Sequence, residues 1–301
     1  MHSFINNYSQ EFKTMKKIIS LALVIIITAL ALVACSKPTE DESNGVKVID
    51  IALSVEEYAF CVAKDNTDLL ASVNAYLAEI KANGKFDAIC NSYFGDGTPA
   101  EVHSAELDES KDQLVVATST GFEPFEMVDG GIYSGIDLEI AAGLAEYLGV
   151  ELVIEDMQFA SVVTSVQQGI CDIGMAGLTI TPARLEIVSF SDSYYDAAQV
   201  LLVKDSCTEF DSCKTADDVV AILNTKDSSC KIGCQTGTTG EIYIVGDADD
   251  PDGYGFSGLQ ATKMAYDYAA LAANAMVNGD IDYVIVDNAP ANAIAKAINN
   301  K

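Results

Sequence analysis

An alternation of short apolar runs and helical patterns, beginning at residue 114, constrains the fold of this chain more than any other feature. Strand-like runs at 114–117, 150–154 and 171–176 alternate with helical patterns at 136–148 and 159–168, and a glycine follows each helical pattern. Glycine commonly ends a helix. This βαβαβ order predicts a mainly parallel sheet with helices on both faces. Such sheets bind ligands beyond the carboxyl ends of their strands, so we expect a site in the loops after the first and third strands.

A second α/β unit follows the first. An extended apolar segment at 194–204 links the two units, as a crossover between lobes would. The second unit is expected to contain helices over 216–223, from residue 238 onward, over 261–277 and over 289–298, with strands over 231–234 and 283–286. We therefore predict an α/β protein with a large lobe over 113–197 and a small lobe over 198–301.

A further set of patterns precedes these two units. They predict strands over 46–53 and 58–63 and helices over 67–81 and 85–94. Residues 95–112 are acidic, contain Gly, Pro and Ser, and have few apolar side chains. That composition is typical of a linker.

The most apolar run of the chain lies near its N-terminus. Residues 18–34 follow the pair Lys16-Lys17 and end in Leu32-Val-Ala-Cys35, which resembles the bacterial lipobox. In that motif the peptide is cut before the cysteine, whose thiol is then acylated. We predict a signal peptide over 1–34 that starts at Met15, lipidation of Cys35, and a polar tether over 35–45. The alternative is a plain signal peptide with a chance cysteine.

The charge of the chain excludes one class of partner. The formal net charge is −28, whereas a nucleic-acid binder needs a basic face. Anionic lipid headgroups would also repel this surface, so we expect contact with the membrane through the lipid anchor alone.

The cysteines leave several states open. Cys61 and Cys171 lie in apolar runs and are expected to be small buried side chains. Disulfides are possible between Cys207 and Cys213 or between Cys230 and Cys234. A zinc site built from those four is a weaker alternative, because their spacing is not a paired C-x-x-C. We expect no metal and no cofactor.

Several ordered motifs in the two units resemble one family. They are Ala117-Thr-Ser-Thr-Gly-Phe-Glu-Pro-Phe-Glu126, Gly135-Ile-Asp-Leu-Glu139, Met175-Ala-Gly-Leu-Thr-Ile-Thr-Pro-Ala-Arg184, Phe190-Ser-Asp-Ser-Tyr-Tyr195, and the segments 233–240 and 282–287. Together they are similar to the amino-acid branch of bacterial extracellular solute-binding proteins, family 3. The resemblance implies a two-lobe periplasmic-binding-protein fold of type II. It also implies a monomer that binds a free L-amino acid, closes about a hinge and delivers the ligand to the permease of an ABC transporter.

The resemblance also suggests a rearranged order. In that family a further segment follows the position of Asn299 and completes the first lobe, and here residues 46–97 resemble that segment. We interpret the chain as a circular permutant. Residues 46–57 would supply a small-lobe strand and hinge, 58–94 the relocated C-terminal part of the large lobe, and 95–112 the join between the usual termini. A linker of this length reaches about 60 Å. The rival interpretation is a tandem duplication with both copies truncated.

A buried amino-acid ligand needs a partner for each of its charges. Arg184 is the only arginine of the chain, and a guanidinium binds a carboxylate through two parallel hydrogen bonds. It matches the carboxylate-binding arginine of the family. Thr238 and Thr239 precede a predicted helix, whose first amides suit an anion or are simply capped. The resemblance gives the Thr239 amide to the same carboxylate, and gives the α-ammonium to Asp287.

The remaining site residues come from the resemblance as well. Gly177 and Thr179 match positions that accept from the ammonium or donate to the carboxylate, and Leu178 lies between them. Phe122 and Phe159 match the aromatic residues that flank the ligand, although an isolated Phe is more often a core residue.

Two residues bear on the ligand side chain. Ser119 occupies a position that is acidic in several relatives that bind cationic or amide side chains, and a serine does not neutralise a cation. Gln235, in the second lobe, is a neutral polar partner. We therefore expect a neutral or polar amino acid, with cystine and glutamine as candidates, and we disfavour lysine and arginine.

Two other classes of function remain as alternatives. Some relatives on this scaffold are dehydratases that act on cyclic acids, and Glu123 or Glu126 could serve as the acid. No nucleophile–base pair is evident in the motifs, so we expect a binding protein rather than an enzyme. A sensory module is the third class, and it would normally carry a further spanning or signalling segment.

Overall fold

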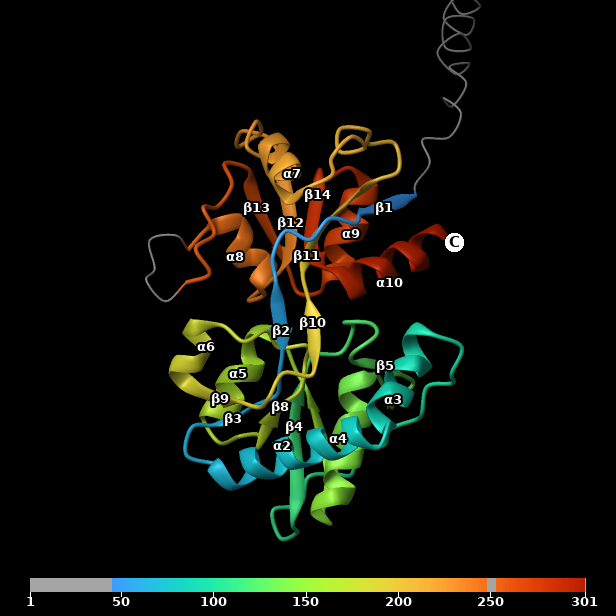
Figure 1. Ribbon diagram of the computed structural model, residues 1–301, viewed down its shortest axis with the longest axis vertical. Coiled ribbons are helices and arrows are strands. Elements are labelled where there is room, and N and C mark those ends of the chain that lie inside the picture. The colour runs from blue at the N-terminus through green and yellow to red at the C-terminus, as the bar shows by residue number, and fades with distance from the viewer. Residues whose placement is uncertain (1–44, 248–252, 301) are drawn as a thin grey trace, which may run out of the picture. The chain divides into compact units, whose positions relative to one another are not determined.

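Two lobes, joined by two extended strands, make up the part of the chain that the computed structural model describes, residues 45–247 and 253–300 (Figure 1). The predicted signal peptide, Cys35 and the predicted tether apart from Gly45 lie outside these residues. Within them, no helix combines the length and the apolarity that a membrane span requires.

The large lobe is built on a five-stranded sheet with the order β7-β4-β8-β3-β9. These strands are β7 (Glu151–Asp156), β4 (Gln113–Thr118), β8 (Ile173–Gly174), β3 (Cys61–Ala63) and β9 (Val188–Phe190). The helices of this lobe are α2 (Thr67–Ala82), α3 (Lys85–Phe94), α4 (Ile136–Leu148), α5 (Phe159–Gln167) and α6 (Pro182–Ile187). A hairpin of β5 (Met127–Asp129) and β6 (Ile132–Ser134) precedes α4.

Two glycines set the limits of α4, the central helix of the large lobe. Gly135 precedes it with φ 129°, and a Cβ there would lie 2.1 Å from the carbonyl oxygen of Phe125. Gly149 ends it in the left-handed region, with φ 75°. Side chains such as Leu138 and Leu144 are wholly buried in the lobe's core. Glycine is required at both ends because a side chain would be strained or would clash.

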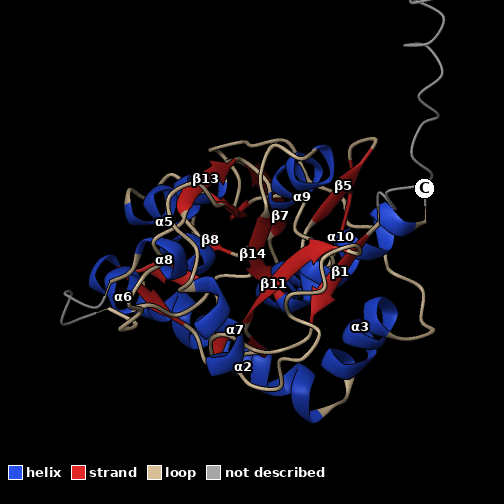
Figure 2. Cartoon of the chain, turned by 90° about the horizontal axis from the view of Figure 1, so that it is seen from above, coloured by secondary structure: helices blue, strands red, loops and turns tan. Residues whose placement is uncertain are grey.

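The small lobe has a second five-stranded sheet, with the order β1-β11-β14-β12-β13. Its strands are β1 (Val46–Ile49), β11 (Gln199–Lys204), β14 (Tyr283–Asp287), β12 (Lys231–Gln235) and β13 (Thr262–Tyr266). Its helices are α7 (Ala216–Leu223), α8 (Thr239–Val245), α9 (Ala269–Asn278) and α10 (Asn288–Asn299). Figure 2 shows helices around the strands of the described body, as the βαβ pattern predicts.

Each sheet contains one strand that runs against the other four. In the large lobe it is β3, which is antiparallel to β8 and β9, and in the small lobe it is β11, which is antiparallel to β1 and β14. These two strands follow the hinge strands β2 (Glu56–Tyr58) and β10 (Tyr195–Ala197), which pair with each other between the lobes (Figure 1). The predicted two-lobe fold with mainly parallel sheets is confirmed. The antiparallel strands β3 and β11 are the ones that enter each lobe from the hinge.

One predicted helix is wrong. Residues 261–277 were expected to form a single helix, but Thr262–Tyr266 is the edge strand β13 and only Ala269–Asn278 is helical. The strand pairs in parallel register with β12 from Lys231 to Gln235. Sheet pairing therefore overrides the helical pattern before the alanine-rich part begins.

Other boundaries differ by less. The predicted strand over 58–63 is split, because β2 ends in the hinge at Tyr58 and β3 begins in the large sheet at Cys61. The strand predicted over 46–53 ends at Ile49, and the strand predicted over 171–176 is reduced to Ile173–Gly174.

The segment 95–112 follows the surface of the large lobe. It contains no helix or named strand, yet the Val102 amide donates to the Tyr133 carbonyl at 2.8 Å, and the Val102 carbonyl accepts from the Tyr133 amide at 3.0 Å. The Ala105 amide donates to the Leu152 carbonyl at 2.8 Å, and the Val102 side chain is buried in the lobe's core. The segment is thus attached along its length.

The described cysteines are all free thiols. Cys61 and Cys171 are buried, as predicted. The four cysteines for which disulfides or zinc were considered lie in the small lobe, and the described residues contain no group of three or more His, Cys, Asp or Glu side chains that could hold a metal ion.

Candidate functional site

The predicted ligand residues lie where strands end at the junction of the two lobes. The large lobe contributes the loops after β4 and β8 and the start of α5, and the small lobe contributes the ends of β12 and β14 and the start of α8. All but one of the predicted side chains are buried: Ser119, Phe122, Phe159, Leu178, Thr179, Gln235, Thr239 and Asp287. Arg184 is half-buried.

Arg184 connects the two lobes. Its Nη1 donates to the carbonyl of Thr179 at 2.7 Å in the large lobe, and its Nη2 donates to the carbonyl of Gly237 at 3.1 Å in the small lobe. The guanidinium carbon lies 5.3 Å from the centroid of the Phe159 ring, a cation–π contact. Thr181 caps α6 by accepting from the Arg184 amide at 3.0 Å, which fixes the start of the helix that carries the guanidinium.

The start of α8 faces this junction from the small lobe. Thr238 is the N-cap, as predicted, and its hydroxyl donates to the carbonyl of Gln235 at 2.8 Å. Thr239 is the first helical residue, and its hydroxyl donates to Glu56 at 2.7 Å. Because α8 has only seven residues, this end offers individual amide groups rather than a strong helix dipole.

Asp287 ends β14 in a buried position. Its Oδ1 accepts from the hydroxyl of Tyr58 at 2.7 Å. Burial, followed by the charge of Glu56, raises the pKa of Asp287 to about 7. A cation beside this carboxyl would favour its charged form and lower its pKa again.

Gly177 is placed so that only a glycine fits. Its φ is +55°, and a Cβ would lie 2.8 Å from Cε1 of Phe122 and 3.3 Å from the ring of Tyr58. Its amide donates to Asp137 at 2.9 Å, and burial raises the pKa of Asp137 to about 7. The contact between Gly177 and Phe122 brings the loops after β4 and β8 together.

Two predicted residues are less firmly connected to the others. Ser119 is buried, and its hydroxyl has no hydrogen-bond partner in the described part of the chain. Gln235 meets the site through its carbonyl, which accepts from Thr238. Both lie at strand ends that face the junction, in opposite lobes.

Glu126, considered above as an acid, is wholly buried. Neither of its carboxylate oxygens has a hydrogen-bond partner among the described residues. Burial, followed by the charges of Asp137, Asp287 and Asp156, raises the pKa of Glu126 well above its ordinary value. Burial at this position therefore favours the neutral form of the carboxyl.

Sequence reasoning missed Glu56, which is 1 % exposed in the hinge strand β2. Its Oε2 accepts from the hydroxyls of Thr179 and Thr239, each at 2.7 Å. The signal was the strand alternation: Tyr58 is buried and Glu57 exposed, so Glu56 had to face inward.

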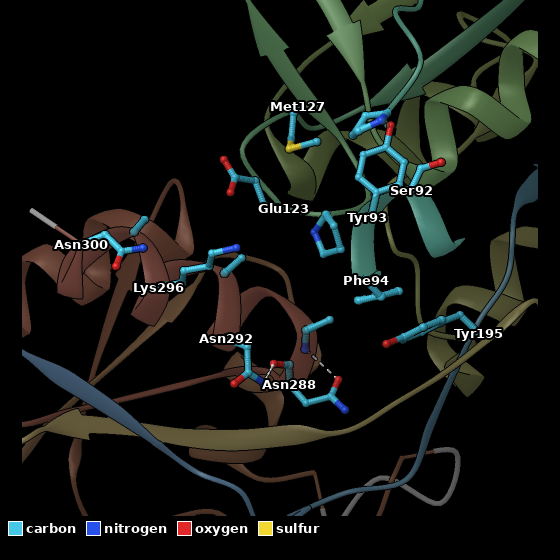
Figure 3. Close-up of a pocket in the computed structure, with 15 residues that line it drawn as sticks. Ser92, Tyr93, Phe94, Glu123, Met127, Tyr195, Asn288, Asn292, Lys296 and Asn300 are labelled. Atoms are coloured by element: carbon cyan, nitrogen blue, oxygen red, sulfur yellow. Dashed lines mark hydrogen bonds between the residues drawn. The ribbon is translucent and has the colours of Figure 1, made fainter. Parts of the chain in front are cut away.

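The two larger pockets among the described residues adjoin the junction. One of about 540 Å³ is lined by Arg184, Gly237 and Thr238, so it opens directly beside the guanidinium. A larger one, of about 710 Å³, lies between α10 and the end of α3. Figure 3 shows Asn292 and Lys296 of α10 on one side of it and Tyr93 and Phe94 on the other. None of the predicted ligand residues lines this larger pocket.

Comparison with known proteins shows the family of this chain. A family model described as bacterial extracellular solute-binding proteins, family 3, matches residues 114–299. The arginine-binding extracellular protein ArtP of Bacillus subtilis (strain 168) is 36% identical over 97 residues, which are 32% of this chain and 38% of that protein. A probable histidine-binding protein of Neisseria gonorrhoeae is 27% identical over 187 residues, which are 62% of this chain and 61% of that protein. The chain thus spans less than two thirds of the length of these relatives.

Solved structures of amino-acid-binding proteins are similar to this chain in fold. An ancestral arginine-binding protein bound to arginine superposes with a TM-score of 0.52 and 32% identity over 62% of this chain and 75% of that one. An ancestral amino-acid-binding protein, described as a precursor of cyclohexadienyl dehydratase, gives 0.51 and 32% over 62% of this chain and 74% of that one.

Proposed function

Since the chain belongs to the bacterial extracellular solute-binding proteins of family 3, we propose that it binds a free L-amino acid between its lobes and delivers it to the permease of an ABC importer. The observation that carries this proposal is the position of Arg184. The only guanidinium of the chain touches both lobes, and the buried acid Asp287 lies at the same junction. A cation and an acid held at one junction match the two ends of a zwitterion.

Each predicted residue has a role in this proposal. Arg184 takes the α-carboxylate through two parallel hydrogen bonds, together with amide groups of Thr179 and Thr239. Asp287 takes the α-ammonium, with help from Gly177. Phe122 and Phe159 flank the ligand, and Leu178 lies in the loop between the binding groups. Because ligand contacts come from both lobes, the closed state binds better and becomes populated when ligand is present.

The identity of the ligand side chain remains the sequence-based prediction of a neutral or polar amino acid. Ser119 and Gln235 are buried and uncharged, which supports it. The relatives point in two directions, since several are named for arginine or histidine, while one solved neighbour is an ancestral arginine-binding protein bound to glutamine. Binding of arginine or lysine more tightly than glutamine and cystine would overturn this part of the proposal.

A thermal-shift panel of amino acids plus cystine tests the binding proposal. Ligand that binds only the folded state raises the melting temperature by mass action. We expect a shift with one or a few amino acids, and its loss in Arg184→Ala. Lys296→Ala is the matched control, because Lys296 is a cation that lines the larger pocket instead.

The two variants separate the two pockets. Loss of the shift in Lys296→Ala with retention in Arg184→Ala would place the ligand in the larger pocket and contradict the site. No shift with any amino acid would contradict the function itself.

The enzymatic alternative is tested with the same protein. A binding protein returns its ligand unchanged, whereas a dehydratase would release water and a new acid. Mass spectrometry of a cyclic dehydratase substrate and of the bound amino acid after overnight incubation distinguishes the two. We expect no product.

The predicted lipoprotein character belongs to this proposal as well. Export with cleavage before Cys35 and acylation of its thiol would hold the protein at the outer face of the membrane. The mass of the N-terminal peptide from membrane fractions tests this, and a free or uncleaved N-terminus would contradict it.

We also infer that the chain is a circular permutant of its family. Residues from the front of the chain supply β1 to the small sheet and β3 to the large sheet, while the family model starts only at residue 114. One front segment that completes both lobes supports a permutation, and it argues against a duplication, in which that segment would repeat a part already present.

A further inference from the structure

Glu56 lies at the meeting point of three parts of the molecule. It belongs to the hinge strand β2, and its carboxylate is 1 % exposed. Its Oε2 accepts from Thr179 in the large lobe and from Thr239 in the small lobe, both at 2.7 Å, and its Oε1 accepts from Ser54 of the hinge at 2.6 Å. One buried carboxylate therefore joins hinge and both lobes.

Two of these hydroxyls already accept a hydrogen bond, which favours donation of their protons to Glu56. The hydroxyl of Ser54 already accepts from the Gln199 amide at 2.8 Å, and the hydroxyl of Thr239 accepts from Nε2 of Gln199 at 3.0 Å. Each hydroxyl has one proton, and each directs it to Glu56. This arrangement favours a group at position 56 that accepts on both of its oxygens. A carboxylate meets that requirement, whereas an amide has a donor on one side.

The two threonines are the ones that the proposed site assigns to the ligand carboxylate. Thr179 also accepts at its carbonyl from Arg184, so its orientation affects the guanidinium as well. The hydroxyls of Thr179 and Thr239 donate to Glu56, and these bonds hold the backbone groups of the two residues at the junction. Glu56 does not need to touch a ligand to influence these groups.

We propose that Glu56 is a positioning residue for ligand binding, which ties Thr179 to Thr239 across the junction and so holds the two halves of the site in register when the lobes are closed. This proposal rests on the proposed function, which identifies the junction as the ligand site. The contribution is large because charge-assisted hydrogen bonds to a buried carboxylate are strong and their loss leaves buried hydroxyls without acceptors.

The test compares Glu56→Gln with Glu57→Gln in the full chain. Glu57 is the adjacent acid of the same strand, and its exposed side chain accepts from the hydroxyl of Ser193 at 3.1 Å. The readouts are the affinity and dissociation rate of the amino acid found in the thermal-shift panel, and the radius of gyration with and without that ligand.

We expect Glu56→Gln to raise the Kd about tenfold or more, mainly through faster dissociation, and to increase the radius of gyration at subsaturating ligand. Glu57→Gln should change each quantity by less than about twofold. Unchanged affinity and dissociation in Glu56→Gln would overturn the proposal.

A second variant keeps the test valid if Glu56→Gln does not fold. Thr239→Val removes the small-lobe donor with little change of shape, and it should also speed dissociation. Where both variants fold, the double variant should lose less than the sum of the single losses, because the two residues act through one contact. Additive losses would contradict the proposal.

The outcomes also separate this inference from the function on which it rests. A wild-type protein that binds no amino acid contradicts the proposed function. In that case the radius of gyration without ligand still tests the role of Glu56: a larger value for Glu56→Gln than for Glu57→Gln supports it, and equal values overturn it.

Discussion

At the scale of single residues, the junction contains more acid than its one arginine balances. Burial lowers the pKa of Arg184 below its ordinary value, and the charges of the nearby acids Glu56 and Asp287 only partly oppose that shift. Burial, followed by the charge of Glu56, lets Asp287 hold a proton at pH values where an ordinary aspartate is ionised. An incoming ammonium replaces that proton as the partner of the carboxyl.

Ligand affinity should therefore rise with pH and level off above about 7. The pKa of Asp287 is about 7 without a cation beside it, and the ammonium prefers the charged form. Below that pKa, binding must displace a proton, and affinity falls by up to about tenfold per pH unit. Calorimetric titrations at pH 5.5, 6.5 and 7.5 in two buffers of different ionisation enthalpy would measure both the affinity and the released proton.

Without ligand, the contribution of Asp287 to folding stability changes with pH in the opposite direction to the ligand affinity. The folded-state pKa of Asp287 lies above the ordinary value of 3.8, so the folded protein binds this proton more tightly than the unfolded chain does. This carboxyl therefore reduces stability as pH rises from about 4 to about 7. Asp287→Asn should bind weakly and with a flatter pH dependence, and a wild-type affinity that is constant from pH 5.5 to 8 would contradict this assignment.

Much of the candidate site could be predicted because its residues stand in recognisable motifs. Arg184 stood out as the only guanidinium, and Gly177 proved to be a position that excludes a side chain. Glu56 could not be found in that way. Its importance comes from contacts with residues 123 and 183 positions away, and no local pattern contains them.

At the scale of elements, helices with clear ends were predicted best. The helices Lys85–Phe94, Ile136–Leu148 and Ala216–Leu223 have the predicted bounds, since caps or glycines fix their ends locally. The edge strand Thr262–Tyr266 was missed, because its structure depends on pairing with β12. Short strands such as β8 also differ from their apolar runs, since pairing partners set their length.

The attachment of β1 to the small lobe can be tested at this scale. Asn299 of α10 donates to the Val46 carbonyl at 2.8 Å and accepts from the Val46 amide at 2.9 Å. We expect Asn299→Ala to lower the free energy of unfolding by about 1–2 kcal/mol, because two hydrogen bonds are lost. Denaturant titration measures this.

Asn292→Ala is the matched control on the same helix. The Asn292 side chain is exposed and donates only within α10, to the carbonyl of Asn288. Its replacement should leave stability within about 0.5 kcal/mol. Equal effects of the two variants would mean that the contact with β1 adds nothing.

At the scale of the whole molecule, the proposed permutation leaves the lobes intact and changes only where the chain is cut. Because Val46 is hydrogen-bonded to Asn299, the start of β1 and the end of α10 are adjacent. A short connection is therefore enough to join them. The segment 95–112 would then be the place for new ends.

A reordered chain tests the permutation directly. It would begin near residue 112, continue to Lys301, and pass through a short glycine-serine linker into residues 46–95. We expect it to fold with a melting temperature within a few degrees of the original and to bind the same amino acid with the same affinity, because no contact in either sheet is removed. Circular dichroism and calorimetry measure both. A reordered chain that folds but has lost ligand binding would contradict the interpretation.

The one antiparallel strand of each sheet, β3 in the large lobe and β11 in the small lobe, affects how force passes between the lobes. The hinge strands β2 and β10 continue into β3 and β11, and each of these is hydrogen-bonded to a neighbour on both sides. A load that passes along the hinge enters each lobe through an interior strand, where it is shared in shear by two rows of hydrogen bonds. Peeling an edge strand would break such bonds one at a time. The lobes can thus rotate as stiff bodies, and the compliance of the molecule is concentrated in the few residues between them.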